Sequence, residues 1–243
     1  CPNGAGQLFT AAKIAHLNAE RLLFASEIKA LFVDRATPRQ PNGDRLYDYL
    51  VYGYLDHTAE TMFADIRQLP PAHRLVYRAG NLAVQRYWDL NPEQRLDDLS
   101  DRAAAERLHE LFFESVRLHL QSDAPIGTCL SGGLDSSAIV CAIARLLDAD
   151  GVDRAMIGER QRTFTASFDD PAFDERRFAR EVIAQTGAQA FFAFPQAEAL
   201  NELLPDLIWR QEEPFGSTSI VAQWCVMQLA GQQGIKVMLD GQG

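Results

Sequence analysis

The sequence predicts an α/β fold, a parallel sheet with helices on both faces, preceded by a smaller β-rich region. Two observations carry this prediction. An apolar run at 126–130 is followed by Ser131-Gly132-Gly133 and then by apolar residues at helical spacing from 139 to 147, the pattern of a strand, a tight loop and a helix. From 163 to 239, strand-like and helix-like stretches alternate, which favours parallel strands joined by right-handed crossovers.

Residues 1–91 contain shorter predicted elements. The adjacent prolines Pro70 and Pro71 interrupt any regular structure at their position. The composition turns polar after Asp89 and stays polar through Ser100, so we expect a domain boundary near residue 92 and domains at 1–91 and 92–243. The elements predicted before this boundary are a strand at 22–26 with a short helical turn after it, a helix at 44–54, and a hairpin of 73–77 with 82–87.

Beyond the boundary, a helix with one apolar face is predicted at 101–121. The polar stretch 149–161 is expected to run over the surface. Glu212 and Glu213, next to Pro214, indicate either a substrate or metal neighbourhood or a capped loop. The remaining predicted elements are strands at 163–168, 190–194 and 235–239, a helix at 174–185 capped by Asp174, and a buried helix at 219–230.

The glycine-rich loop carries the strongest functional signal. Two adjacent glycines allow a sharp turn and a close approach of the backbone to a ligand. Ser131, Ser136 and Ser137 surround the first turn of the next helix, where free N–H groups and the helix dipole favour a phosphate. Asp135 would repel a phosphate unless a cation lay between them, and magnesium is commonly held by one or two carboxylates together with phosphate oxygens. A ligand-free glycine turn, capped by the serines and Asp135, is the alternative.

The stretch 130–137, read as LSGGLDSS, resembles the pyrophosphate loop of the N-type ATP pyrophosphatases, and among them the glutamine-hydrolysing asparagine synthetases. No lysine follows the glycines as in G-x-x-x-x-G-K-[ST], so a P-loop kinase or GTPase is not indicated. Three further stretches agree in family order. Residues 22–31 resemble the segment that closes the family's N-terminal-nucleophile glutaminase domain, 69–73 with 86–90 resemble the connection to the synthetase domain, and 239–243 resemble a later nucleotide-contacting loop.

The resemblance implies an ATP-dependent ligase, an asparagine synthase. In the family, the side-chain carboxylate of aspartate attacks the α-phosphate of Mg-ATP, and pyrophosphate leaves. Ammonia made from glutamine then converts β-aspartyl-AMP into asparagine. Asp135 is implied as the magnesium ligand, and the implied ATP-binding residues are Leu130, Ser131, Gly132, Gly133, Asp135, Ser136, Ala166, Asp240 and Gly241.

Gln242 departs from the family pattern, because the best-known members have a glutamate there that is implicated in the amide-forming, catalytic step. A glutamine side chain cannot accept a proton as a carboxylate does, so a general base must come from elsewhere or the acceptor differs. Two alternatives therefore stay open. One is a related amidotransferase acting on another carboxylate, in secondary-metabolite or cell-envelope synthesis, and the other is an inactive remnant that retains the nucleotide loop.

The segment that closes the glutaminase domain begins at Leu22, too close to Cys1 for a complete domain. We therefore expect a fragment with the end of the glutaminase domain and the first part of the synthetase domain. Cys1 is not expected to be a glutaminase nucleophile, and the fragment is not expected to hydrolyse glutamine.

Composition limits the partners. The formal net charge of −10 argues against nucleic acid and anionic membranes. No apolar run reaches the roughly 20 residues of a membrane span, and no signal peptide is recognised, so a cytoplasmic protein is expected. Cys129, Cys141 and Cys225 are expected to be buried thiols without a zinc or disulfide pattern. The expected partners are aspartate, ATP and ammonia, with a homodimer as the assembly to test.

Overall fold

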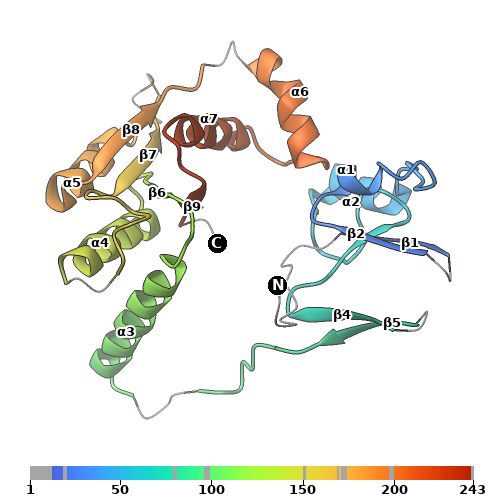
Figure 1. Cartoon of the computed structure of the whole chain (residues 1–243), viewed down its shortest axis with the longest axis horizontal. Helices are drawn as coiled ribbons and strands as arrows, with labels where there is room; N and C mark the ends of the chain where they lie inside the picture. Colours follow the sequence, from blue (N-terminus) through green and yellow to red (C-terminus); the bar gives the residue numbers. More distant parts are fainter. Residues whose placement is uncertain are drawn as a thin grey trace. The chain divides into compact units, whose positions relative to one another are not determined.

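The computed structural model (Figure 1) describes residues 13–18, 21–78, 81–95, 99–149, 152–168, 170, 174–196 and 200–241. The chain divides into two compact units. The β-rich unit comprises Cys1–Arg95 and Pro205–Gly216, and the α/β unit comprises Leu96–Leu204 and Ser217–Gly243. Within the described ranges, no helix has the length and apolar character needed to cross a membrane.

The β-rich unit contains a three-stranded antiparallel sheet in the order β2-β1-β3 and a separate hairpin, β4-β5. Ile28, Leu31 and Ile66 form its small buried apolar cluster. The elements of this unit are β1 (Lys13–Asn18), β2 (Arg21–Ala25), α1 (Ile28–Leu31), α2 (Gly43–Tyr52), β3 (Ile66–Gln68), β4 (His73–Arg78) and β5 (Asn81–Arg86). They agree with the predicted strand, helices and hairpin, and β1 and β3 are two further strands that were not predicted.

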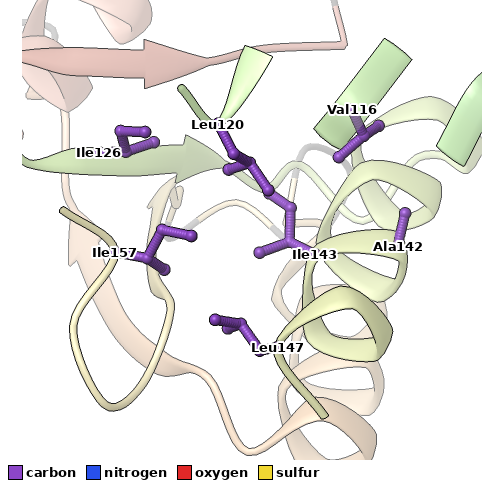
Figure 2. Close-up of a cluster of buried hydrophobic side chains, with 7 residues drawn as sticks. All are labelled: Val116, Leu120, Ile126, Ala142, Ile143, Leu147 and Ile157. Carbon is purple, nitrogen blue, oxygen red and sulfur yellow. The ribbon is translucent and has the colours of Figure 1, made fainter. Parts of the chain in front are cut away.

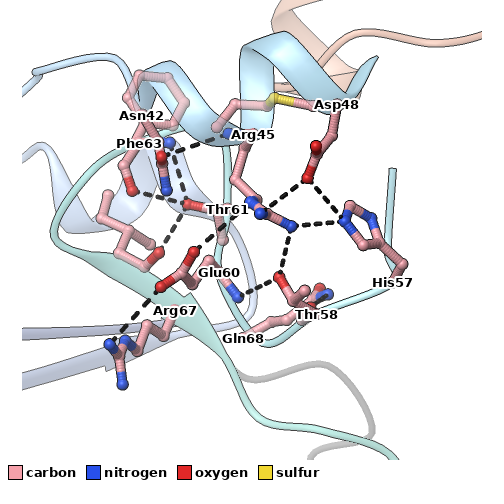
Figure 3. A network of polar contacts seen from close by, with 12 residues as sticks. Asn42, Arg45, Asp48, His57, Thr58, Glu60, Thr61, Phe63, Arg67 and Gln68 are labelled. Carbon is pink, nitrogen blue, oxygen red and sulfur yellow. Dashed lines mark hydrogen bonds and ion pairs between the residues drawn. The ribbon is translucent and has the colours of Figure 1, made fainter. Parts of the chain in front are cut away.

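A polar network supplements this small core (Figure 3). The Asn42 side chain caps α2 by accepting the N–H of Arg45 at 3.4 Å. The Arg45 guanidinium pairs with Asp48 at 2.8 Å and lies 3.5 Å from Glu60. The second contact of Asp48 is His57 Nε2, at 2.9 Å from its Oδ2 atom. Several charges are thus paired around α2, none of whose residues is fully buried.

The α/β unit is built on a four-stranded parallel sheet in the order β8-β7-β6-β9. This confirms the predicted fold class. Its elements are α3 (Asp101–His119), β6 (Ile126–Cys129), α4 (Leu134–Asp148), β7 (Arg162–Ala166), α5 (Arg176–Thr186), β8 (Gln189–Ala193), α7 (Ser219–Gln232) and β9 (Val237–Leu239). Helix α6 (Leu200–Gln211) is shared, because its residues from Pro205 onward belong to the β-rich unit.

Two apolar clusters cover the two faces of this sheet. The first joins α3, β6 and α4 to the segment around Ile157 (Figure 2). The second joins α7 to Phe164 of β7. In β9, Val237 and Leu239 pack against the first cluster and Met238 packs against the second. Since neighbouring side chains of a strand point to opposite faces, α4 and α7 lie on opposite faces of the sheet.

The stretch 149–161 differs from its predicted surface course. Ile157 is only 1% exposed and belongs to the first cluster. The N–H of Ile126 at the start of β6 donates to the carbonyl of Met156 at 2.8 Å, which holds the turn against the sheet. The polar composition of the stretch concealed this apolar pair, so the prediction was wrong at its centre.

The helix predicted to be capped by Asp174 begins at Arg176, with Glu175 in the N-cap position. Asp174 still serves the helix start, because its Oδ1 atom accepts the N–H of Arg176 at 3.1 Å. The same oxygen lies 2.7 Å from the Arg176 Nε atom, and this hydrogen bond holds the pKa of Asp174 below its usual range. Asp174 therefore still caps the start of the helix, but from the position before the N-cap residue Glu175.

Candidate functional site

The candidate site lies at the carboxyl ends of the parallel strands. The chain runs outward from β6 to β7 and β8, then returns so that β9 pairs with the other edge of β6. The strand order therefore reverses between β6 and β9. In open α/β sheets, ligands bind beside such a switch point, outside the carboxyl ends of the strands.

Two serine hydroxyls hold the loop between β6 and α4. The Ser136 Oγ atom accepts the N–H of Ser131 at 3.3 Å and lies 3.0 Å from the Ser131 Oγ atom. It also donates to the carbonyl of Gly133 at 3.3 Å, while Ser131 Oγ accepts the N–H of Gly133 at 3.2 Å. Because all these partners belong to the loop or to the first turn of α4, the loop is formed without a ligand.

Gly132 is required by both conformation and space. Its φ of 89° lies in the left-handed region, which side chains other than hydrogen disfavour. A Cβ atom there would lie 2.7 Å from Phe178 Cβ and 2.9 Å from the backbone nitrogen of Ala179. Helix α5 thus packs directly on the loop and fixes its path.

Gly241 brings the end of β9 against the same loop. A Cβ atom at Gly241 would lie 2.8 Å from the backbone nitrogen of Ser136 and 3.2 Å from Asp135 Cβ. The Asp240-Gly241 segment therefore passes over the first turn of α4. Only a glycine permits this approach, because the nearest atom is backbone and cannot move aside cheaply.

A cavity of about 370 Å³ opens at this place. That size is typical of small-ligand sites. Of the nine residues predicted to bind ATP, eight line the cavity, and Gly132 lies within the same loop. Those eight residues are Leu130, Ser131, Gly133, Asp135, Ser136, Ala166, Asp240 and Gly241.

Other lining residues were not predicted. Their largest group comes from the first turns of α7, where Ser219, Ala222 and Gln223 reach the cavity. The hydroxyl-rich stretch 217–219 before an apolar helix was a signal for a helix start, but the helix was predicted to be simply buried. The others are Cys129, Leu134, Phe164, Thr165, Phe168, Glu175 and Val226.

The electrostatics of the cavity combine two helix starts with three carboxylates. Neither Gly133 at the start of α4 nor Thr218 at the start of α7 provides a side-chain cap, and both helices present their first turn to the cavity. Helix N-termini attract anions. Asp135, Glu175 and Asp240 line the same space and would repel one. An anion held by the helix starts thus needs a cation near the carboxylates.

Magnesium fits this donor set. Among the described residues, no group of three or more His, Cys, Asp or Glu side chains could hold a metal ion by itself. Magnesium in nucleotide sites commonly uses one or two carboxylates and completes its octahedron with phosphate oxygens and water. Asp135, in the exposed first turn of α4, is placed to be such a carboxylate.

Cys129 lies at the end of β6 and also lines the cavity. Burial is the main cause that raises the pKa of its thiol to about 12, and the charge and hydrogen bond of Asp240 add to the shift. The thiol is therefore protonated at neutral pH and acts as a donor to Asp240, rather than as a nucleophile. In the part of the chain that the structure describes, Cys129, Cys141 and Cys225 are free and partly buried.

Three other candidate residues were singled out besides those that line this cavity. Gln242 lies outside the described residues. Glu212 and Glu213 do not line it, and their carboxylates instead accept backbone N–H groups of the β-rich unit. Of the two interpretations of this glutamate pair, the contacts favour the structural one over the substrate or metal neighbourhood.

Comparison with known proteins agrees with the fold. Residues 107–243 match the asparagine synthase family, and residues 9–88 match the glutamine amidotransferase domain. Asparagine synthetase [glutamine-hydrolyzing] 1 of Bacillus subtilis is 25% identical over 227 residues, 92% of this chain and 33% of that protein. Asparagine synthetase [glutamine-hydrolyzing] 3 of the same organism is 34% identical over 129 residues, 53% of this chain and 21% of that protein.

A fungal protein is similar over the same extent. Amidase chyE of Penicillium rubens is 26% identical over 234 residues, 92% of this chain and 34% of that protein. The chain thus spans about a third of the length of each of these two relatives, Amidase chyE and asparagine synthetase 1.

The parallel sheet with helices on both faces and the glycine-serine loop at its switch point define an α/β class of protein. Within that class, the match covers more than half of the chain, from 107 to 243. The chain belongs to the asparagine synthase family, which confirms the membership that its motifs predicted.

Proposed function

We propose that the protein is an ATP-dependent ligase that activates a carboxylate by adenylation and transfers it to ammonia derived from glutamine, with aspartate as the favoured acceptor. The observation that carries the proposal is the pre-formed loop of 131–136 at the switch point of the sheet, beneath a cavity lined by two helix starts. Membership of the asparagine synthase family supports the amide-forming chemistry.

Each part of the cavity has a role in this reaction. The N–H groups of the loop and of the first turn of α4 bind phosphate oxygens, and the hydroxyls of Ser131 and Ser136 donate to them. Ala166 and Phe168, at the end of β7, line the side proposed for the adenine. Asp240 and Gly241 close the cavity over α4.

Asp135 holds magnesium in this proposal. The bound ion supplies positive charge that offsets the phosphate oxygens during attack at the α-phosphate. Asp135 orients the ion from the first turn of α4, and the helix dipole adds to the stabilisation of the pyrophosphate that leaves. The acceptor carboxylate displaces pyrophosphate, and ammonia then displaces AMP from the acyl-adenylate.

The β-rich unit is proposed to be the end of a glutaminase domain, with residues 1–91 as its sequence and 92–243 as the first part of the synthetase domain. The match of 9–88 to the glutamine amidotransferase domain supports this division. One modification is needed, because Pro205–Gly216 belongs to the β-rich unit by its contacts. A homodimer stays a prediction, which analytical ultracentrifugation of the protein can test.

A second function is an amidotransferase that acts on a different carboxylate. Two observations favour keeping it. Gln242 replaces the glutamate of the best-known family members, and the relatives include a protein named as an amidase. Both functions share adenylation, so the acceptor distinguishes them.

The test measures pyrophosphate released by the protein from Mg-ATP and ammonia, with aspartate and with a panel of other carboxylates. Release specific to aspartate, with asparagine formed, is the expected result. Release with another acid would select the second function. No release with any acid would favour a remnant that retains the loop without the chemistry.

Asp135→Asn tests the metal site within the same assay. The substitution keeps the shape of the side chain but removes its charge, so magnesium-dependent release should fall by at least about 100-fold, in the range observed when preorganised electrostatic groups are removed. Asp148→Asn, at the exposed end of the same helix, is the matched control and should retain full activity. Undiminished release by Asp135→Asn would remove this carboxylate from the metal site.

A further inference from the structure

The segment between α6 and α7 is tied to the β-rich unit by two adjacent carboxylates. Glu212 Oε2 accepts the N–H of Ile28 at 2.8 Å, and its Oε1 accepts the N–H of Lys29 at 2.7 Å. The same Oε1 lies 3.2 Å from Lys29 Nζ. Both oxygens of Glu212 are therefore used, and the side chain is only 11% exposed.

Glu213 makes a second set of contacts with a different part of the unit. Its Oε1 accepts the N–H of Met62 at 2.8 Å, and its Oε2 lies 3.2 Å from Lys13 Nζ on β1. The Tyr49 hydroxyl of α2 donates to the carbonyl of Phe215 at 2.9 Å. Four parts of the β-rich unit thus hold the segment 212–215, namely β1, α1, α2 and Met62 before β3.

Glu212 adopts a backbone conformation that suits this role. Its φ of 65° is in the left-handed region, which is uncommon for a residue other than glycine. The N–H of Glu212 donates to the carbonyl of Ile208 at 2.9 Å, so the residue ends α6. The turn sends the two neighbouring carboxylates to two separate sets of N–H groups. A strained conformation of this kind persists only where surrounding contacts fix it.

The same segment leads directly to the candidate nucleotide cavity. By sequence it lies inside the asparagine synthase match, 107–243, although by contacts it belongs to the β-rich unit. Helix α7 begins at Ser219, shortly after Phe215, and its first turns supply Ser219, Ala222 and Gln223 to the cavity. The carboxylate contacts and the cavity lining are therefore joined by a few residues of chain.

We propose that Glu212 and Glu213 are positioning residues that couple the β-rich unit to nucleotide binding, by fixing the chain that enters α7. This inference rests on the proposed function, because it takes the cavity to be the nucleotide site. Nucleotide binding then strengthens the carboxylate contacts, and the contacts strengthen nucleotide binding by the same factor.

Carboxylates are required at both positions for a chemical reason. Each glutamate accepts at both of its oxygens, whereas a glutamine has one acceptor oxygen and one NH₂ donor. Glu212→Gln would set an NH₂ group against a backbone N–H, and Glu213→Gln would set one against either an N–H or a lysine. The substitution preserves size, so it tests the charge and the acceptors rather than the packing.

The experiment uses magnesium with α,β-methylene-ATP, which cannot release pyrophosphate, and follows amide hydrogen exchange of the protein. In the wild type, saturating probe should slow the exchange of the Ile28, Lys29 and Met62 amides by about tenfold, within the usual range of coupling between two sites. In the Glu212→Gln/Glu213→Gln variant, these amides should not respond, and the dissociation constant of the probe should rise by about the same factor. Glu202→Gln, exposed in the first turn of α6, is the control and should behave as the wild type.

Hydrogen exchange of the wild-type protein tests the coupling even if the double variant folds poorly. Binding of the probe without any change at the three amides would overturn the coupling and leave the proposed nucleotide function intact. A wild-type protein that does not bind the probe at all would overturn both. Slower exchange at the three amides in the wild type and in Glu202→Gln, together with weaker binding by the double variant, would support the coupling.

Discussion

The loop at 131–136 and the segment at 212–215 both hold backbone with side-chain oxygens, but over very different sequence distances. In the loop, the Ser131 and Ser136 hydroxyls bond to groups no more than five residues away. In the segment, the carboxylates of Glu212 and Glu213 bond to groups 151 to 200 residues away. The oxygens are neutral in the first region and charged in the second.

This difference separates a binding region from an anchoring one. A hydroxyl can donate or accept, so the serines can exchange their mutual contacts for phosphate oxygens while the loop keeps its path. An ionised carboxylate only accepts, and charge-assisted hydrogen bonds are roughly twice as strong as neutral ones. Long-range contacts must also offset the entropy of ordering the chain between them. Strong bonds therefore suit the segment, and exchangeable ones suit the loop.

Removing a carboxylate from the segment should have the largest effect. Glu212→Ala leaves two backbone N–H groups without their acceptor and removes one of the two carboxylates paired with Lys29, so we expect a loss of about 3 kcal/mol in the stability of the β-rich unit. Urea titration followed by the fluorescence of Trp209, which lies in α6 and belongs to the same unit, measures this loss. Glu202→Ala, at an exposed glutamate of the preceding helix α6, should change stability by no more than about 0.5 kcal/mol. Equal losses in the two variants would show that the segment contacts add nothing.

A side chain at Gly132 should have the next largest effect. Gly132→Ala combines a left-handed φ with contacts of 2.7 and 2.9 Å to α5, and we expect a loss of about 2 kcal/mol in the stability of the α/β unit, together with loss of nucleotide binding. Gly133→Ala is the matched control, since its φ is −68° and its nearest contact is 3.3 Å to a serine hydroxyl. In thermal unfolding, the melting temperature of Gly133→Ala should be well above that of Gly132→Ala.

Removing a loop hydroxyl should have a smaller effect. Ser136→Ala takes away the oxygen that joins the Ser131 N–H to the first turn of α4, so we expect a loss of about 1 kcal/mol in stability. Nucleotide binding should weaken more than this loss explains, because the hydroxyl is also proposed to contact phosphate. Ser137→Ala is the control. A Ser136→Ala protein with unchanged nucleotide affinity would limit this hydroxyl to a structural role.

The loop could be predicted from sequence because its contacts are local. Adjacent glycines, serines beside a helix start and a preceding apolar strand are visible within a dozen positions, and the elements that follow have clear periodicity. The clustering of Asp240 with Asp135 was implied by the family resemblance alone, since no local pattern links the two residues.

The partners of Glu212 and Glu213 could not be predicted in this way. No periodicity links residues that lie 151 to 200 positions apart, and an acidic pair before a proline is compatible with several environments. Ile157 was missed because a single apolar contact within a polar stretch leaves no pattern. The first turn of α7 was missed because an apolar helix with little polar asymmetry does not indicate which side chains reach a cavity.

The smallest effect on stability at neutral pH concerns Cys129, the last residue of β6. Its thiol interacts with Asp240, which is distant in the sequence. Burial and Asp240 raise the pKa of this thiol from 9.0 to about 12. The folded state therefore retains a proton that the unfolded state loses, so the contribution of the thiol to stability is intact below pH 9 and is lost as the pH rises from 9 towards 12. At pH 8, the thiolate population of Cys129, and with it the rate of alkylation by iodoacetamide, should be about 1000-fold lower than in the urea-unfolded protein. Mass spectrometry of the labelled peptide measures the rate. Asp240→Asn should raise that rate in the folded protein, and an unchanged rate would show that burial alone protects the thiol.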